Sequence, residues 1–216
     1  FETTLKKLRK NCELRKSELE SESAELTSRR TKVAADLGAA ITDKLKNLGF
    51  AQSLFEVHLT AVEPGPTGAD RVEFHFAPNP GEAPQPLRKI ASSGEMARVM
   101  LAIKTVLSAA DHTPILVFDE IDANVGGRTA TKVSDELAEV AKRHQVFCIT
   151  HLPQVAAAAT THLMVTKMVE SGRTVTSIEL LDKKARTHEI SRMMGADTES
   201  ETARLHAESL LNGATT

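Results

Sequence analysis

The sequence has few aromatic residues and few cysteines, and both shortages exclude classes of function. It contains no Trp or Tyr, and aromatic residues make up 3% of its 216 residues. This is too few for the base-stacking surfaces that bind single-stranded nucleic acid. The two cysteines, Cys12 and Cys148, form neither a metal-binding cluster nor a disulfide framework, so we expect two free thiols.

Long apolar runs and an excess of one charge are also absent. No run approaches the roughly 18 apolar residues of a membrane span, and the N-terminus lacks the apolar core of a signal peptide, so we expect a cytoplasmic chain. Lys and Arg number 27 against 29 Asp and Glu, a net charge of -2. Any binding to DNA must therefore depend on local patches. Hydrophobic residues at 41% and charged residues at 26% are typical of a folded globular domain.

Residues 1–48 predict one long helix, because they contain no Pro, no Gly before Gly38, and many Glu, Lys, Arg, Leu and Ala. The companion positions of its apolar stripe are mostly charged, so the alternative is a solvated surface helix. We expect a coiled coil, with wider packing after Val33 and a helix end near Gly49. Apolar or small residues recur every seven positions, as in a coiled coil, at Leu5, Cys12, Leu19, Leu26, Val33 and Ala40.

Residues 49–216 predict a globular body of strands and helices. Residues 55–60 and 71–76 alternate apolar and polar side chains, and turn formers in the link between them favour an antiparallel pair with a loose loop. The continuous apolar runs at 115–118 and 146–150 are typical of parallel strands that are covered on both faces. Helices at 94–109, 128–143, 189–194 and 200–211, with a closing hairpin around 170–173, complete the prediction.

Two adjacent carboxylates, Asp119 and Glu120, come directly after the first apolar run. The C-terminal ends of parallel strands are where such sheets place their ligands. Asp119 could hold Mg²⁺ there, directly or through water, and Glu120 could orient or deprotonate an attacking water. The alternative is a strand that ends in a solvated acidic turn.

Small residues begin the helix expected at 94–109, in the segment Ser92-Ser93-Gly94-Glu95. Free backbone N–H groups and the positive end of the helix dipole can bind an anion at such a position. An N-cap at Ser92, with Glu95 completing a capping box, explains the same letters without a ligand.

His151 follows the second apolar run, so two adjacent strands would deliver polar groups to one edge of the sheet. A histidine without such company is more often a hydrogen-bonded structural residue. Between the two strand ends, residues 121–127 form a Gly-rich loop in which Asp122 lies close to Glu120 in the sequence.

In this order, the four elements resemble the ATPase head of ABC-type proteins: a signature motif (SSGE), a Walker B strand (ILVFDE), a D-loop (IDANVGG) and a switch histidine, His151. Residues 91–194, with FDEID, CITHLPQVAA and LDKKAR, are similar to the RecN family of bacterial DNA double-strand-break repair proteins, in the SMC-like branch. The resemblance implies an α/β fold, in which residues 1–48 are the returning arm of a coiled coil. Residues 49–216 would be the C-terminal lobe of the head, with a mostly parallel sheet flanked by helices and an antiparallel hairpin.

The resemblance also implies a role for each motif residue. Asp119 would support Mg²⁺, Glu120 would be the general base for ATP hydrolysis, and His151 would contact the γ-phosphate. Asp122 would signal across a head-to-head homodimer. The residues that would meet the ATP bound by the opposite head are Ser92, Ser93, Gly94 and Glu95.

Two positions depart from the pattern that the family leads us to expect. Ser93 stands where the first of two signature glycines is usual, and its side chain could crowd an approaching phosphate. Asn124 stands where the D-loop often has Gly, but Asn tolerates left-handed backbone angles, so the loop shape can survive.

The phosphate-binding loop G-x-x-x-x-G-K-[ST] is absent, because none of the 11 glycines is followed by Lys. The chain is therefore either a pseudo-enzyme or the C-terminal part of a head that a coiled coil splits in two. A start inside a predicted helix, without Met, fits the second reading. By itself the segment is expected to be inactive.

The resemblance predicts that the complete protein is an ATPase. It would use ATP and Mg²⁺ between paired heads to clamp or bridge DNA in double-strand break repair and recombination. The expected partners are double-stranded DNA and DNA ends, the N-terminal lobe of the same protein and a second copy, in the nucleoid and without a membrane. The alternative is a non-hydrolysing coiled-coil tether that organises DNA or proteins. Basic clusters at 6–16 and 183–186 could contact DNA phosphates, although a solvated helix face is the simpler explanation.

Overall fold

The computed structural model describes residues 1–90, 92–170, 172–195 and 200–213. The chain divides into two compact units, Phe1–Lys46 with Phe50–Ala91, and Asn47–Gly49 with Ser92–Thr216. Ala91, which precedes the signature motif, and Ser171, in the expected hairpin turn, lie outside the described residues.

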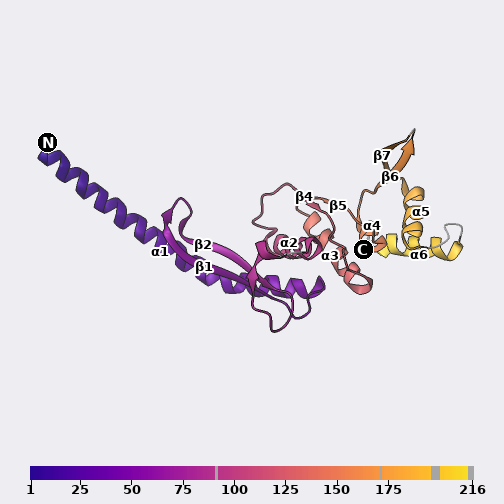
Figure 1. Ribbon diagram of the computed structural model, residues 1–216, viewed down its shortest axis with the longest axis horizontal. Helices are drawn as coiled ribbons and strands as arrows, with labels where there is room; N and C mark the ends of the chain where they lie inside the picture. Colours follow the sequence, from indigo (N-terminus) through magenta and orange to yellow (C-terminus); the bar gives the residue numbers. More distant parts are fainter. Residues whose placement is uncertain (91, 171, 196–199, 214–216) are drawn as a thin grey trace. The chain divides into compact units, whose positions relative to one another are not determined.

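The first unit is organised around the long helix α1 (Glu2–Asn47), drawn in indigo in Figure 1. The long N-terminal helix is thus confirmed. Residues 1–22 are all exposed, and the first buried residue of α1 is Ser23. Packing therefore begins earlier than the expected position after Val33, because a β-hairpin reaches this part of the helix. The coiled coil, and the division of the chain into residues 1–48 and 49–216, stay predictions.

That hairpin consists of β1 (Leu54–Gly65) and β2 (Gly68–Ala77) and runs alongside α1. The C-terminal end of β2 also pairs with the short strand β3 (Gln85–Pro86). The antiparallel pairing is as expected, with Phe55 opposite Phe76. The loose loop is wrong, because the ladder continues past an irregularity to Gly65 and Gly68 and leaves only two residues in the turn.

The base of the hairpin packs against the residues that follow α1 and against α1 itself. The rings of Phe50 and Phe76 meet edge to face, with centroids 5.2 Å apart. The backbone N–H of Phe55 donates to the hydroxyl of Thr42 at 3.0 Å. Gly38 permits this approach, since a β-carbon there would lie 3.0 Å from the Phe55 carbonyl oxygen.

The second unit contains the parallel pair β4 (Ile115–Phe118) and β5 (Gln145–Cys148), with α2 (Ser93–Leu107) and α3 (Gly127–Ala141) packed against each other beside it. The core of this unit includes Val99, Leu101, Ile103, Leu116, Phe118, Ile121, Val133, Leu137 and Val140. The expectation that both faces of these strands are covered is wrong for this chain. Side chains of one face are exposed, Val117 to 65%.

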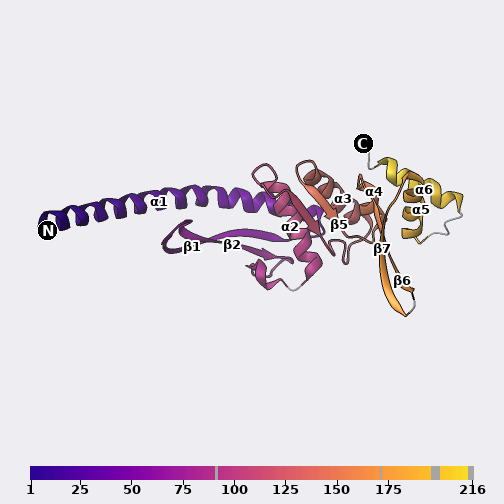
Figure 2. The same ribbon diagram turned by 90° about the horizontal axis from the view of Figure 1, so that it is seen from above.

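The C-terminal part of this unit contains a second hairpin and three helices, shown in Figure 2. Its elements are β6 (Leu163–Glu170), β7 (Arg173–Leu180), α4 (Pro153–Ala158), α5 (Lys183–Met193) and α6 (Glu201–Gly213). The short 3-10 helix η1 (Leu87–Lys89) is part of the first unit. The closing hairpin is confirmed by the pairing of Glu170 with Arg173. The fifth helix begins earlier than expected, and the sequence reading missed α4, although its Pro153 at the first helical position is a usual start signal.

The expected mostly parallel sheet is wrong for the described residues. They form three small sheets, and only β4 and β5 run parallel. The other pairs, β1 with β2, β2 with β3 and β6 with β7, are antiparallel, and a link as short as the one between β1 and β2 can join only antiparallel strands. None of the helices in the described ranges is long and apolar enough to cross a membrane.

Candidate functional site

The C-terminal ends of β4 and β5 lie side by side, and their polar side chains lie at one edge of the sheet. Phe118 is opposite Cys148 in the parallel register, and the backbone N–H of Ile149 donates to the Phe118 carbonyl at 2.9 Å. Asp119 and Glu120 follow the first strand and are exposed, and His151 leaves the second. The structure thus brings together the carboxylates and the histidine that the sequence singles out.

Asp122 connects the two strand ends. Only 4% of its side chain is exposed. Its Oδ2 accepts hydrogen bonds from the Thr150 hydroxyl at 2.5 Å and from the backbone N–H of His151 at 2.8 Å. The Nδ1 atom of His151 lies 3.2 Å from the same oxygen, while 72% of that side chain remains exposed. One buried carboxylate therefore fixes the start of the histidine loop and leaves most of the imidazole exposed to solvent, where it can meet a ligand.

The turn after β4 contains both left-handed non-glycine residues of the described chain, Glu120 at φ 56° and Asn124 at φ 58°. Asn124 has the conformation that Asn was expected to tolerate. A left-handed Glu is unusual and costs backbone energy, and such residues cluster at functional sites. The buried Ile121 between them anchors the turn in the core.

The first turn of α2 packs against this loop. Ser92 is the N-cap, and its hydroxyl accepts a hydrogen bond from the backbone N–H of Glu95 at 3.3 Å, as the capping interpretation expects. The hydroxyl of Ser93 donates to Oε2 of Glu120. A β-carbon on Gly94 would lie 2.7 Å from that of Ala123, so only glycine permits this approach.

Two residues that the sequence reading missed hold the site together. Arg98 is buried, and its Nη1 donates to the carbonyls of Ile121 at 3.2 Å and Ala123 at 3.0 Å; burial lowers its pKa. Thr150 bonds Asp122 as described. Thr150 directly precedes His151, and Arg98 lies three positions after Glu95, but their long-range partners leave no periodic signal in the sequence.

Cys148 reports on the electrostatics of this edge. Burial, and then the negative charges of Asp122 and Asp119, raise the pKa of its thiol to about 12. The strand end is therefore a partly dry and negatively charged environment, which disfavours any further anion unless a cation accompanies it.

In the part of the chain that the structure describes, no three His, Cys, Asp or Glu side chains are arranged to hold a metal ion. Mg²⁺ rarely needs such a cage, since one or two carboxylates, substrate phosphates and water usually complete its shell. The exposed Asp119 at the strand end fits that second kind of site.

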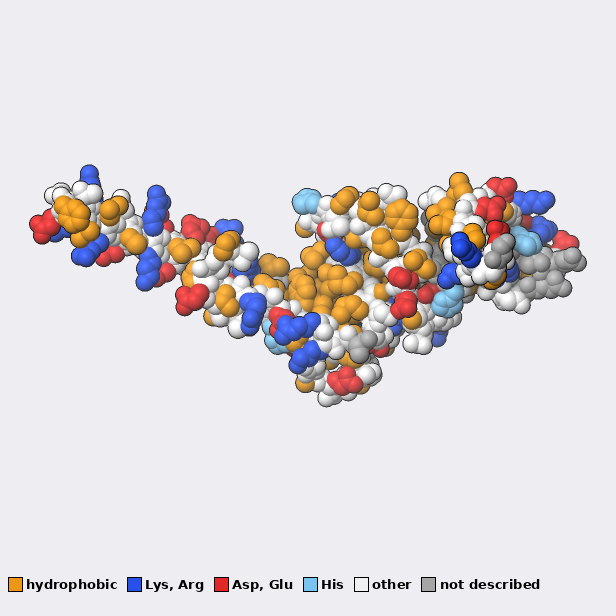
Figure 3. Space-filling model, turned by 45° about the horizontal axis from the view of Figure 1, so that its top comes forward, with side chains coloured by type: hydrophobic (Ala, Val, Ile, Leu, Met, Phe, Trp, Pro, Cys, Tyr) orange, Lys and Arg blue, Asp and Glu red, His pale blue; other side chains and the backbone are white. Residues whose placement is uncertain are grey.

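The basic clusters differ in what they contact. Arg186 donates to the carbonyls of Ala156 at 3.2 Å and Ala157 at 2.8 Å, and so satisfies the end of α4. Its role is at least partly structural. The early part of α1 carries charges of both signs along its surface (Figure 3), with Arg15 bonded to Glu18 at 2.7 Å, which weakens its case as a basic DNA-binding face.

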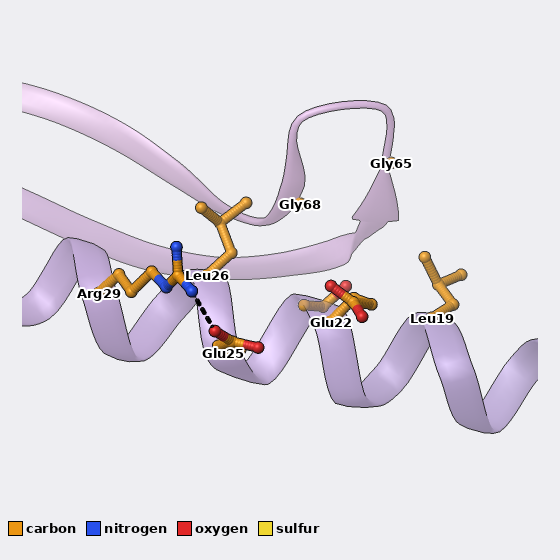
Figure 4. Close-up of a pocket in the computed structure, with 8 residues that line it drawn as sticks. Leu19, Glu22, Glu25, Leu26, Arg29, Gly65 and Gly68 are labelled. Carbon is orange, nitrogen blue, oxygen red and sulfur yellow. Dashed lines mark hydrogen bonds and ion pairs between the residues drawn. The ribbon is translucent and has the colours of Figure 1, made fainter.

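A surface hollow of about 360 Å³ lies elsewhere, between α1 and the turn of the first hairpin. Figure 4 shows Leu19 and Leu26 on the side of α1 that faces the hairpin turn, with Arg29 paired to Glu25. None of the predicted site residues lines it. The candidate site is thus an open sheet edge, not this hollow.

No protein-family model matches the sequence. A protein called DNA repair protein RecN from Halalkalibacterium halodurans is 39% identical over 216 residues, which cover 98% of this chain and 38% of that protein. The protein of the same name from Xylella fastidiosa is 44% identical over 189 residues, which cover 86% of this chain and 34% of that protein. The chain therefore spans only about a third of the length of these relatives, and it matches their C-terminal part.

Among solved structures, the Smc head domain with a coiled coil and joint from Pyrococcus yayanosii is similar to this chain. The TM-score is 0.58 at 20% identity, and the match covers 82% of this chain and 32% of that one. This likeness confirms an α/β fold of the SMC head type with a long N-terminal helix.

Proposed function

Because the chain belongs to the RecN family, as a homologue of the C-terminal third of these DNA repair proteins, we propose that it is one half of an ATPase head. The complete protein would bind and hydrolyse ATP between two paired heads, and so clamp or bridge double-stranded DNA and its ends in break repair and recombination. One observation carries the proposal. Asp119, Glu120 and His151 leave one edge of a parallel strand pair, beside the N-terminus of α2.

Glu120 is the proposed general base. Its carboxylate is exposed at the strand end, on a residue with a left-handed backbone. A carboxylate in this position can take the proton of a water that attacks the γ-phosphate. His151, whose imidazole is mostly exposed on a backbone fixed by Asp122, would contact that phosphate.

Asp119 is the proposed support for Mg²⁺, which, when bound, would neutralise charge that develops on the phosphates. The carboxylate is exposed and adjacent to Glu120, and oxygen ligands are those that Mg²⁺ prefers. The raised pKa of the Cys148 thiol supports a negative edge at which a cation would be welcome.

The N-terminus of α2 is proposed to meet ATP bound by the opposite head of a homodimer. Free N–H groups of a first helical turn and the helix dipole favour a phosphate. Ser92 and Ser93 add hydroxyls, Gly94 keeps the backbone close, and Glu95 is held by the N-cap. Asp122 would pass the state of one site to the other, since it contacts both Thr150 and His151.

The N-terminal lobe of the same protein is the proposed cover of the open face of β4 and β5. Ile115, Val117, Phe147 and Ile149 are all exposed there, in strands whose sequence is typical of a fully buried sheet. That lobe would also supply the phosphate-binding loop that this sequence lacks. The relatives are long enough to contain it, since this chain spans about a third of them.

Residues 1–48 are proposed to be one arm of a coiled coil and residues 49–216 the lobe. Leu5, Leu8 and Leu19 are exposed on a helix of 46 residues, and a single helix in water gains little stability without a packed face. A second helix along this stripe would bury them.

The test is Glu120→Gln in the full-length protein. Loss of the general base is expected to lower ATP turnover by about 10² or more, while binding of ATP, measured with a fluorescent analogue, is retained. Glu63→Gln, which neutralises an exposed carboxylate on β1, is the matched control and should leave turnover unchanged.

Unchanged turnover in Glu120→Gln would contradict the proposed role and favour the non-hydrolysing tether. That alternative has its own support in the absence of a phosphate-binding loop from this sequence. Light scattering can measure how well Glu120→Gln bridges two DNA duplexes, with and without ATP. This measurement separates a clamp driven by hydrolysis from a passive scaffold.

A further inference from the structure

A single side-chain contact joins the signature motif to the proposed general base within the same chain. Ser93 is the first residue of α2, and its hydroxyl donates to Oε2 of Glu120. Both side chains are exposed, so neither is needed to fill the core. Ser93 also stands where the family usually has a glycine. A glycine at this position would have no hydroxyl to make the contact.

The backbones on either side of the contact are fixed. Gly94 packs so closely that a β-carbon would lie 2.9 Å from the Glu120 carbonyl oxygen. Arg98 donates to two carbonyls of the same turn. Ser93 and Glu120 therefore stay neighbours, and the contact can open only by rotation of the two side chains.

The hydroxyl of Ser93 has one proton, so it can donate to one acceptor at a time. While it donates to Glu120, the carboxylate lies at the positive end of α2, where an anion is stabilised. A phosphate that arrived at the same helix end would compete for that proton and would repel the carboxylate. The two anions therefore exclude each other.

We propose that Ser93 is a positioning residue, which holds Glu120 at the start of α2 until a phosphate of a nucleoside triphosphate from the opposite head displaces it. The inference rests on the proposed function. ATP bound at one composite site then frees the general base that serves the other site. Hydrolysis at the two sites is coupled, and a head pair with only one ATP is restrained.

The experiment measures ATP turnover of the full-length protein over a wide range of ATP concentrations, with Ser93→Ala, Ser93→Gly and Ser93→Thr. Removal of the hydroxyl is expected to raise turnover at low ATP by about tenfold, the usual size of a lost hydrogen bond to a charged group. Turnover at saturating ATP should rise less than this or fall, because the same hydroxyl is proposed to meet the phosphate there, so that the dependence on ATP becomes less steep. Ser93→Thr keeps the hydroxyl and should behave as the unaltered protein.

Each other outcome overturns the inference. Equal turnover of Ser93→Ala and the unaltered protein at low ATP would mean that the contact restrains nothing. An increase in Ser93→Gly alone would point to crowding by the β-carbon, and a decrease at low as well as at saturating ATP would make Ser93 only a phosphate ligand. Glu120→Gln separates the two proposals: if it retains turnover, the proposed function fails, whereas if it abolishes turnover and Ser93→Ala changes nothing, only the coupling fails.

Discussion

Asp70 in the first unit and Asp122 in the second are two buried carboxylates with similar chemistry and different surroundings. Each has 4% of its side chain exposed, and each accepts a hydrogen bond from a threonine hydroxyl, Thr27 at 2.8 Å and Thr150 at 2.5 Å. Asp70 also pairs with Arg30 at 3.2 Å, whose other nitrogen donates to a backbone carbonyl.

The difference lies in what these contacts leave available. The Arg30 side chain is 26% exposed, and both of its terminal nitrogens bond to the hairpin. We call the first cluster closed, because its polar groups bond to one another and not to a ligand. The second cluster ends in an imidazole that is mostly exposed. Burial and hydrogen bonding of a carboxylate therefore do not by themselves distinguish the candidate site, whereas an exposed polar side chain on a fixed backbone does.

The two cysteines should differ most strongly between the regions. With its pKa raised from 9.0 to about 12, Cys148 has about a thousandfold less thiolate at pH 8 than an ordinary thiol. Its alkylation by iodoacetamide, followed by peptide mass spectrometry, should be slower by that order and keep rising with pH until about 12. The exposed Cys12 is the internal reference. Equal rates at pH 8 would show that the strand end is neither dry nor negative.

Removal of either buried carboxylate should have the next largest effect. Asp122→Ala leaves the Thr150 hydroxyl and the His151 amide without their acceptor, at a cost of about 2 to 3 kcal/mol. Hydrogen exchange of that amide should accelerate roughly a hundredfold. Asp70→Ala should accelerate exchange along the hairpin turn by a similar factor.

Only Asp122→Ala should also reduce ATP turnover of the full-length protein. Asp43→Ala is the control for both, since this carboxylate is 77% exposed in its pair with Lys46 and should cost less than about 0.5 kcal/mol. Loss of turnover in Asp70→Ala would erase the distinction between the closed and the open cluster.

Replacement of glycines should change the free energy of unfolding least, and the cost should again differ between the two regions. Gly94→Ala would place a β-carbon 2.9 Å from the Glu120 backbone oxygen, which cannot move aside, and should cost about 2 kcal/mol. Gly68→Ala, at φ 99°, meets mainly the flexible end of Leu26 and should cost about 1 kcal/mol. Urea unfolding followed by circular dichroism suits a chain without Trp. Gly65→Ala, with open space around it, should be neutral; a reversed order would refute the assignment of rigid and yielding contacts.

Local patterns in the sequence were sufficient to predict the long helix, both hairpins and the order of the two parallel strands. The apolar period of a helix or strand is set by its own backbone geometry, so it can be recognised without neighbours. The same logic placed Asp119, Glu120 and His151 at one sheet edge, since the ends of parallel strands coincide.

Contacts between distant segments could not be predicted in this way. The bonds from Thr150 to Asp122 and from Arg98 to the loop after β4 depend on packing and leave no periodic trace. The docking of the hairpin on α1 joins Thr27 to Asp70 across 43 positions. The open face at Val117 was also missed, because an apolar run records that a strand is covered in its final assembly, not which chain covers it.

The hairpin of the first unit stiffens α1 by holding it at two points. It is attached at its base, where the Phe55 amide bonds Thr42, and at its turn, where Asp70 bonds Thr27 and Arg30. Residues 1–26 extend beyond the second attachment by about 39 Å, at about 1.5 Å per residue. A sideways force on the free end of α1 is carried by these two attachments, which lie about 15 residues apart in the helix, instead of by bending of the helix. Torque applied at the free end therefore reaches the hairpin as tension along β1 and β2.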